Sequence, residues 1–361
     1  MTTTPDLAAG VLSTEQFADK IFDAALGAAQ VQALYLGDRL GWYAVLAEEG
    51  PLTAAELAHR TGTVERYARE WLEHQAVSGV LVADLNHEPV RFGLPAEYAE
   101  VLVNGDSTNY LTPIARFFTA TGLRMHDLVE AYRNGGGVSW EQLGDDARQA
   151  QGAVNRPLFL HQLTSQLLPQ IPDLHRVLQT GARVADVGCG EGWSAIGLAL
   201  GYPACQIDGY DIDEPSIGAA RRNAAGRGVA DRVSFAVADA AAGMPTARYD
   251  AVFAFECVHD LPDPVAVLST MRRIARPGAP VVVMDERTAD KFTPDAGPVE
   301  QLLYGYSIVC CLPDCMSHEG SVATGTVMRA STLDGYARSA GFDGATPLEV
   351  DHDFFRFYRL Q

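Results

Sequence analysis

Three closely spaced glycines, Gly188, Gly190 and Gly192, follow residues 184–187, which read as a strand. Glycines at the end of a strand let a ligand approach the backbone closely. A dinucleotide-binding turn of the form G-x-G-x-x-G would need its third glycine at the position of Trp193. Because the bulky Trp193 leaves less room for a pyrophosphate, the spacing favours a smaller ligand with an amino-acid end over a dinucleotide.

Two acidic residues follow the next two predicted strands. Asp211 ends a strand about 20 residues beyond the glycine turn, where an acid commonly binds ribose hydroxyls. Asp239 follows the third strand, where a carboxylate is able to accept a hydrogen bond from an adenine amino group. Either acid alone reads equally well as a solvated loop residue. Because the carboxyl ends of parallel strands share one edge of a sheet, the ordered set indicates a single nucleoside site.

From Arg183 onward the chain alternates between short strands and helices. The predicted strands are 184–187, 206–210, 233–237, 251–255 and 280–284, with helices at 193–200, 215–225 and 264–275, and two final strands at 348–351 and 354–358. Strands separated by helices imply a parallel sheet, so we predict an α/β fold with a doubly wound, mostly parallel sheet. Residues 287–330 form a long insertion with no clear period, which we expect to be lid-like.

The first part of the chain predicts a helical domain. Residues 31–82 read as closely spaced helices, in which Thr53 and Glu56 have the spacing of a capping box. Thr63 is expected to cap the next helix, and short strands follow at 80–82 and 90–92. Helices followed by a hairpin are the order of a winged helix.

These changes of pattern divide the chain into three parts. Residues 1–102 form the predicted winged-helix domain, which we expect to mediate dimerisation and to cover the substrate. Residues 103–170 form a helical connector with a helix at 159–168, and residues 171–361 form the ligand-binding α/β domain.

Residues 181–280 resemble the class I S-adenosylmethionine-dependent methyltransferases, whose domain is Rossmann-like. The stretch from Asp186 to Gly192 matches the first motif of that family, and Phe253 to Pro262 matches its fourth strand and active-site edge. The whole chain is similar to a bacterial group with an N-terminal winged helix, often labelled transcriptional regulators. The resemblance implies S-adenosylmethionine as cofactor, held by Asp186, Gly188, Gly190, Gly192, Asp211, Ile212, Asp239, Ala240, Phe255 and Glu256.

The same resemblance implies methyl transfer to a small-molecule acceptor. Such a transfer needs alignment of nucleophile, methyl group and leaving sulfur, and a base when the acceptor must lose a proton. His259 follows the fourth strand, on the methyl side of the site in this fold, and a histidine ordinarily titrates near neutral pH. It is therefore the candidate base, with Asp260 to orient it; its alternative roles are to bind substrate or to cap the following turn. Oxygen, nitrogen and carbon acceptors are all open.

A metal is the alternative chemistry at this position. Some enzymes that resemble this chain methylate the carbon beside a 2-oxo acid with a metal held partly by histidine. Here His259 and Asp260 would supply ligands, with Cys310, Cys311 or His318 from the insertion. Cys310 stands where a second ligand histidine is expected, and thiolates favour softer ions. The spacing also lacks the C-x-x-C pairs of a zinc site, so we predict no metal.

Aromatic residues are the candidates for an acceptor pocket. The predicted substrate residues are Trp42, Tyr43, Phe159 and Tyr304, with Phe117, Phe118 and Tyr306 as further candidates. Each taken alone is more often part of a core than of a pocket. Together they favour an aromatic or apolar acceptor of the secondary-metabolism type.

Composition limits the partners. The net charge of −19 argues against nucleic acid and against anionic membrane surfaces. No apolar run approaches the roughly 20 residues of a bilayer span, and Met1 to Asp19 lacks the pattern of a signal peptide. The six cysteines lack the spacing of a disulfide framework, so we expect a reduced, cytoplasmic setting.

A transcriptional regulator that senses S-adenosylmethionine is the rival function, supported by the winged-helix pattern. The helix expected to enter a DNA groove lies within 63–79. Its basic residues are Arg66 and Arg69, against Glu65, Glu70 and Glu73. A groove-binding helix should not be net negative. We therefore expect a homodimer without a nucleic acid partner.

Overall fold

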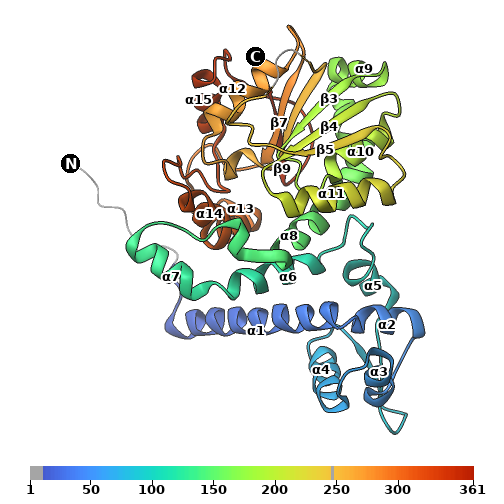
Figure 1. Cartoon of the computed structure of the whole chain (residues 1–361). Coiled ribbons are helices and arrows are strands. Elements are labelled where there is room, and N and C mark those ends of the chain that lie inside the picture. The colour runs from blue at the N-terminus through green and yellow to red at the C-terminus, as the bar shows by residue number, and fades with distance from the viewer. Residues whose placement is uncertain (1–10, 245–247) are drawn as a thin grey trace, which may run out of the picture. The chain divides into compact units, whose positions relative to one another are not determined.

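The structure, a computed structural model, describes residues 11–244 and 248–361, so the first ten residues of the predicted winged-helix domain lie outside it. The chain divides into two compact units (Figure 1). The first runs to Asn104 and includes Asn109–Thr119, and the second comprises Gly105–Thr108 and Ala120–Gln361. The separate connector at 103–170 stays a prediction.

The first unit consists of helices and one short hairpin. Its elements are α1 (Thr14–Arg39), α2 (Trp42–Glu49), α3 (Ala54–Thr61), α4 (Glu65–Val77), β1 (Val82–Asp84), β2 (Arg91–Gly93), α5 (Ala96–Leu102) and most of α6 (Thr112–Gly122). β1 and β2 pair antiparallel, slightly later in the chain than predicted. This order is the predicted one of helices followed by a hairpin.

Two helix N-termini in this unit test the predicted caps, the capping box of Thr53 and Glu56 and the cap by Thr63. Thr53 accepts the Glu56 N–H at 3.2 Å, and the Glu56 carboxylate accepts the Thr53 N–H at 2.8 Å, which confirms the capping box. The prediction that Thr63 caps α4 is wrong. The N-cap residue is Val64, which makes no side-chain cap. The Thr63 hydroxyl is hydrogen bonded to the Thr61 hydroxyl, at 2.9 Å.

A seven-stranded sheet of order β5-β4-β3-β6-β7-β9-β8 forms the centre of the second unit. Its strands are β3 (Arg183–Val187), β4 (Gln206–Asp211), β5 (Val233–Val237), β6 (Ala251–Phe255), β7 (Val281–Glu286), β8 (Ala345–Pro347) and β9 (Phe355–Leu360). The strands from β3 to β7 are parallel, and β9 is antiparallel to β7 and β8. The strand order reverses between β3 and β6, which confirms the doubly wound, mostly parallel sheet.

Helices cover both faces of this sheet. α9 (Pro172–Gln179), α10 (Trp193–Gly201) and α11 (Glu214–Gly226) lie on one side, and α12 (Pro264–Ile274) and α15 (Ala330–Ser339) on the other (Figure 1). In β6, Phe253 and Phe255 belong to the first of these two cores, and Val252 and Ala254 to the second. Since successive side chains of a strand point to opposite faces, a strand buried on both sides is apolar throughout.

Two predicted segments differ from the structure, and a third had no predicted secondary structure. No strand forms at 348–351, and the edge strand is β8, because Leu348 makes only a single N–H bond to the Phe357 carbonyl, at 2.8 Å. The helix predicted at 159–168 is a π-helix, η1 (Leu158–Leu167). The insertion at 287–330, for which the sequence shows no clear period, contains α13 (Gly297–Tyr306), η4 (Ser307–Cys311) and α14 (Leu312–Ser317), and its lid-like role stays a prediction. The π-helical turns of η1 and η4 depart from the 3.6-residue period on which the predictions rest.

The remaining helices of the second unit precede the sheet or connect its strands. They are α7 (Met125–Asn134), α8 (Trp140–Pro157), η2 (Leu168–Gln170) and η3 (Val258–Asp260). All six cysteines are free thiols. Within residues 11–244 and 248–361, no helix has both the length and the apolar character needed to cross a membrane.

Candidate functional site

The glycine-rich turn joins β3 to α10 with its backbone in the left-handed region. The φ angle is 75° at Gly188, 50° at Gly190 and 81° at Gly192. A Cβ atom at Gly188 would lie 2.6 Å from Sγ of Cys257, and one at Gly192 would lie 2.6 Å from the ring of Phe235. These positions require glycine for space as well as conformation. The turn therefore brings bare backbone to the carboxyl edge of the sheet.

Asp211, the last residue of β4, holds this turn against the neighbouring strand. One of its carboxylate oxygens accepts the Gly190 N–H at 2.8 Å, and the other accepts the Asp213 N–H at 2.9 Å. Burial raises the pKa of Asp211, and these backbone donors act in the opposite direction. Ile212 beside it is largely exposed. The structure thus places the predicted ribose-binding acid in direct contact with the glycine turn.

Asp239 and Ala240 follow β5, the neighbour of β4. Asp239 is exposed and its carboxylate accepts the Ala241 N–H at 2.8 Å, while Ala240 is buried. β5 pairs with β4 in parallel register, with Val237 opposite Asp211. The two acids therefore lie at the same edge of the sheet.

Asp186 is fully buried in β3. The Ser194 hydroxyl donates to one carboxylate oxygen, while the other oxygen has no hydrogen-bond partner. Burial raises the pKa of Asp186 to about 7. A buried oxygen without a donor, at the base of the glycine turn, is a candidate acceptor for a positively charged ligand group.

His259 lies in η3, directly after β6, and only 2% of it is exposed. Its Nδ1 atom lies 2.6 Å from Oδ1 of Asp285 and 2.8 Å from Oε2 of Glu286, both at the end of β7. Its Nε2 atom lies 3.3 Å from Oδ1 of Asp260, whose side chain is 39% exposed. The ring is therefore held between carboxyl groups on both sides, with Nε2 toward the more exposed one.

These carboxyl groups control the charge of His259. Burial alone would lower the pKa of His259, but Asp260, Glu286 and Asp285 together raise it well above the ordinary value. Burial also raises the pKa of Glu286, whereas the histidine charge holds that of Asp285 below its usual range against the effect of burial. The arrangement favours an imidazolium paired with the Asp285 carboxylate beside a protonated Glu286.

Glu256 comes directly after β6 with a φ of 53°. A left-handed conformation is costly for a residue other than glycine, and such strain concentrates at functional sites. Its Oε1 atom accepts a hydrogen bond from Gln151 at 3.3 Å, and its Oε2 atom is buried without a hydrogen-bond partner. Burial raises its pKa. Phe255 before it packs into the core, with its ring centroid 5.7 Å from that of Phe159.

Two sets of side chains present donor atoms of the kind that bind metals. His259, Asp260 and Cys311 form one set, and His259, Asp285 and Glu286 form the other, each with its donor atoms within 4.8 Å of one another. Of the three residues that the sequence suggested from the insertion, the structure therefore brings Cys311 to the histidine. The prediction of no metal stays a prediction.

The aromatic substrate candidates are mostly core residues. Trp42 and Tyr43 are 2% and 1% exposed in the core of the first unit, where their polar atoms are hydrogen bonded. Phe159 lies in the core of the second unit. Tyr304 alone of these four is exposed, and its hydroxyl accepts a hydrogen bond from Arg329 at 2.9 Å. Large aromatic rings supply much of the buried apolar area, so burial inside a unit explains three of the four positions.

Asp285 and Glu286 are site residues that the sequence analysis does not name. They end β7 directly after four apolar residues, and β7 pairs in parallel with β6, which leads to His259. Both are almost completely buried. A sequence signal for them exists, namely two acids at the carboxyl end of an apolar strand. Acids in such a buried position need a partner to compensate their charge, which makes them candidates for a site.

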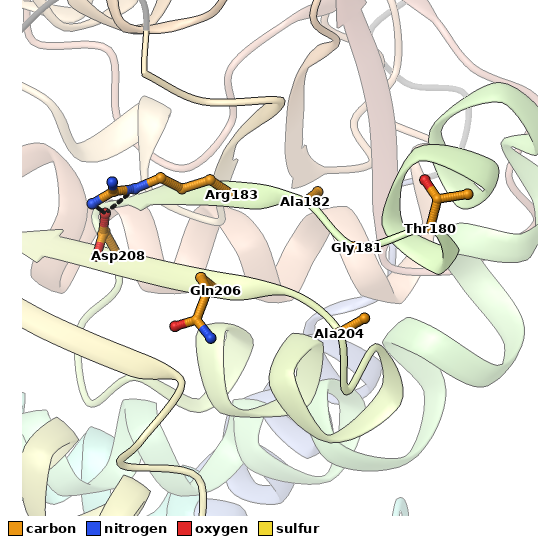
Figure 2. A pocket seen from close by; sticks show the side chains of 7 residues that line it. All are labelled: Thr180, Gly181, Ala182, Arg183, Ala204, Gln206 and Asp208. Carbon is orange, nitrogen blue, oxygen red and sulfur yellow. Dashed lines mark hydrogen bonds and ion pairs between the residues drawn. The ribbon is translucent and has the colours of Figure 1, made fainter.

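A separate hollow of about 540 Å³ lies at the opposite edge of the sheet, where β3 and β4 begin. Figure 2 shows Arg183 and Asp208 on these adjacent strands, joined by an ion pair at 2.8 Å. Its other lining residues are Thr180, Gly181, Ala182, Ala204 and Gln206. Ligands of open parallel sheets bind at the carboxyl ends of the strands, so this hollow is not the candidate site.

Comparison with known families assigns a type to each unit. Residues 178–312 match the family model of a methyltransferase domain, and residues 28–104 match that of an Rv2258c-like winged helix-turn-helix domain. The first match contains the glycine turn, Asp211 and His259. The predicted pair of domain types is confirmed.

Known relatives share part of the sequence and most of the fold. The 27-O-demethylrifamycin SV methyltransferase of Amycolatopsis mediterranei is 35% identical over 124 residues, which cover 34% of this chain and 43% of that protein. The first curated relatives are matched over only 39–51% of their own length. The structure of the mitomycin 7-O-methyltransferase MmcR has a TM-score of 0.71 at 21% identity, covering 96% of this chain and 98% of that one.

A second solved structure, human N-acetylserotonin methyltransferase in complex with SAM, has a TM-score of 0.67 at 20% identity. It covers 97% of this chain and 99% of that chain. These two likenesses show a shared fold over nearly the whole chain.

Proposed function

We propose that this chain, which carries a methyltransferase domain and an Rv2258c-like winged helix-turn-helix domain, transfers a methyl group from S-adenosylmethionine to a small-molecule acceptor. The contact between Asp211 and the Gly190 N–H carries this proposal. It joins a carboxylate to a bare glycine turn at the edge where doubly wound sheets bind nucleotide-like ligands.

The residues at this edge fit S-adenosylmethionine. Asp211 and Asp239 offer carboxylates to the ribose and adenine, and the turn around Gly190 leaves its backbone uncovered. The unpaired buried oxygen of Asp186 suits the cationic amino-acid end. When bound, S-adenosylmethionine supplies an electrophilic methyl group. Trp193, where a dinucleotide turn has glycine, disfavours the nicotinamide alternative.

His259 is the proposed general base for the acceptor. Asp285 holds Nδ1, so the neutral ring presents the lone pair of Nε2 toward the more exposed side of the cluster. There it accepts the proton that the acceptor loses as its nucleophilic atom takes the methyl group. The surrounding carboxyl groups make His259 a stronger base but keep it protonated at neutral pH. We therefore expect methyl transfer to become faster as the pH rises above neutrality. Near-wild-type turnover by His259→Ala would remove it as the base.

Calorimetric titration tests the cofactor. We expect the protein to bind S-adenosylmethionine and not NADH, and Asp211→Asn to weaken S-adenosylmethionine binding by about tenfold or more, since a carboxylate accepts stronger hydrogen bonds than an amide. Asp231→Asn, which changes an acid that is 76% exposed, is the matched control and should bind normally. NADH binding, or an unchanged affinity of the Asp211 variant, would refute the assignment. Turnover of labelled methyl donor against a panel of small aromatic acceptors tests the transfer itself.

The regulator alternative is disfavoured by the charge on α4. Its two arginines are each paired within the helix, Arg66 with Glu70 and Arg69 with Glu65. A helix that reads DNA needs free cationic side chains for phosphates and bases. A gel shift at low salt distinguishes the two functions, because retardation of mixed DNA by the purified protein would favour the regulator.

A homodimer is part of the proposal. α1 exposes an apolar row that includes Phe17, Ile21, Phe22 and Leu26, each more than half exposed. Large contiguous apolar surfaces mark interaction sites, and a two-fold contact between copies requires only this one surface. Phe22→Asp should convert a dimer into a monomer in light scattering; a wild-type protein that is monomeric at micromolar concentration would contradict the proposal.

A further inference from the structure

Four carboxyl groups surround His259. Asp285 and Glu286 lie against Nδ1 at 2.6 and 2.8 Å, and Asp260 lies 3.3 Å from Nε2. Glu256 follows the same strand as His259 and is close enough for the histidine charge to act on its carboxyl. The four groups come from the ends of the adjacent parallel strands β6 and β7.

This cluster lacks positive charge. Among residues 11–244 and 248–361, no arginine or lysine forms an ion pair with any of the four carboxyl groups, and His259 is the ion-pair partner of three. Asp314 of α14 adds a further acid, whose pKa is raised to about 6 by burial and by the charge of Asp260. With Glu286 protonated and Asp285 paired with the imidazolium, no further positive charge in the described residues is left for Asp260 and Glu256.

Two of the four carboxyl groups also have a buried oxygen with neither a hydrogen bond nor an ion-pair contact, namely Oε2 of Glu256 and Oδ2 of Asp285. Oδ1 of Asp260 and Oε2 of Glu286 have no contact of this kind except with the His259 ring. Asp285 is only 1% exposed, and its hydrogen bonds with His259 and with the Glu286 N–H both involve Oδ1. Buried carboxylate oxygens without donors are costly, so these atoms are candidate acceptors for a donor or cation carried by a ligand.

We propose that this cluster binds a protonated amine on the acceptor molecule, anchored by Asp260 and Glu256 beside His259. The proposal rests on the proposed function, in which this edge of the sheet holds the acceptor. A protonated nitrogen has no lone pair, so the amine is the recognition group and the methyl group goes to another atom of the same molecule. An acceptor that carries a carboxylate instead would be repelled.

The distances favour an organic ammonium over a metal ion. The 2.6 Å contact between Nδ1 and Asp285 is that of a direct N–H···O hydrogen bond, and Oε2 of Glu286 lies 2.8 Å from the same nitrogen. Ligand atoms held around one ion at bonds of about 2.0–2.6 Å stand further apart than this. On the Nε2 side, Asp260 and Cys311 combine a hard and a soft donor, which suits no single class of ion well. The side chain of Asp260 is 39% exposed, against 1% for Asp285 and 6% for Glu286, which suits a group that arrives and leaves with the substrate.

Saturation-transfer NMR with three matched probes tests the anchor. Tyramine, tyrosol and 4-hydroxyphenylacetate share a phenol and a two-carbon arm, and end in an ammonium, a hydroxyl and a carboxylate. In the presence of S-adenosylhomocysteine we expect tyramine to bind the wild-type protein at least about tenfold more tightly than 4-hydroxyphenylacetate. Asp260→Asn should reduce this preference to about threefold or less, and Asp231→Asn should leave it unchanged. Glu256→Gln is the second variant, should Asp260→Asn fail to fold.

Several results would overturn the anchor. They are equal or tighter binding of the carboxylate probe, an unchanged preference in both variants, no binding of any probe, or displacement of tyramine by micromolar Mn²⁺. S-adenosylhomocysteine affinity is measured separately by calorimetry. Loss of that affinity would count against the proposed function, whereas loss of the amine preference alone would count only against the anchor.

Discussion

Asp186 makes the stability of this protein depend on pH in a way that one substitution should remove. Its carboxyl is fully buried, and burial raises its pKa to about 7. In the unfolded chain an aspartate ionises near its ordinary value of about 3.9. Between these two values the folded protein holds a proton that the unfolded chain has released, so the folded state loses stability as the pH rises toward 7.

The size of the effect follows from the two pKa values. Each pH unit between them changes the free energy of unfolding by about 1.4 kcal/mol. From pH 5.5 to the folded-state value of about 7, Asp186 alone should therefore lower the unfolding free energy by about 2 kcal/mol, with little further change up to pH 8.5. Asp186→Asn does not ionise and still offers an oxygen to the Ser194 hydroxyl, so its stability should lack this component.

Urea unfolding at pH 5.5 and 8.5 measures the effect in the protein without ligand. The difference between the two pH values should be about 2 kcal/mol smaller in Asp186→Asn than in the wild type. Other buried acids contribute equally to both proteins and cancel in this comparison. Asp231→Asn removes an exposed charge and should behave like the wild type. Equal pH dependence in Asp186→Asn and the wild type would refute the assignment of a raised pKa to this buried carboxyl.

Two further predictions concern the site. Gly188→Ala should destabilise the fold by about 2–4 kcal/mol, because it combines a left-handed backbone with a methyl group 2.6 Å from Sγ of Cys257. The control, Gly27→Ala in the open middle of α1, should instead stabilise the protein. Urea unfolding of both variants measures the two effects. Asp285→Asn should lower the pKa of His259, because it removes one of the carboxylates that stabilise the imidazolium. Histidine NMR titration measures this pKa, and an unchanged or higher value would contradict the ion-pair geometry.

The sequence determined the parts of this protein that depend on local physics. Apolar runs between turn residues indicated the five parallel strands, and the glycine spacing indicated the turn where backbone lies bare. Thr53 and Glu56 identified a helix start because a capping box involves only four consecutive residues. Positions directly after strands also placed Asp211 and Asp239 at one edge, since the carboxyl ends of parallel strands converge.

The tertiary structure decided what depends on residues distant in the chain. Asp285 and Glu286 reach His259 only because β7 lies beside β6, and this pairing changes the histidine from a near-neutral base into one held protonated by carboxyl groups. Trp42 and Tyr43 lie in the core of the first unit, which the sequence could not decide, because burial depends on which surfaces meet and not on residue type alone. Charge and burial are properties of an environment, and the environment of these side chains is assembled by the fold.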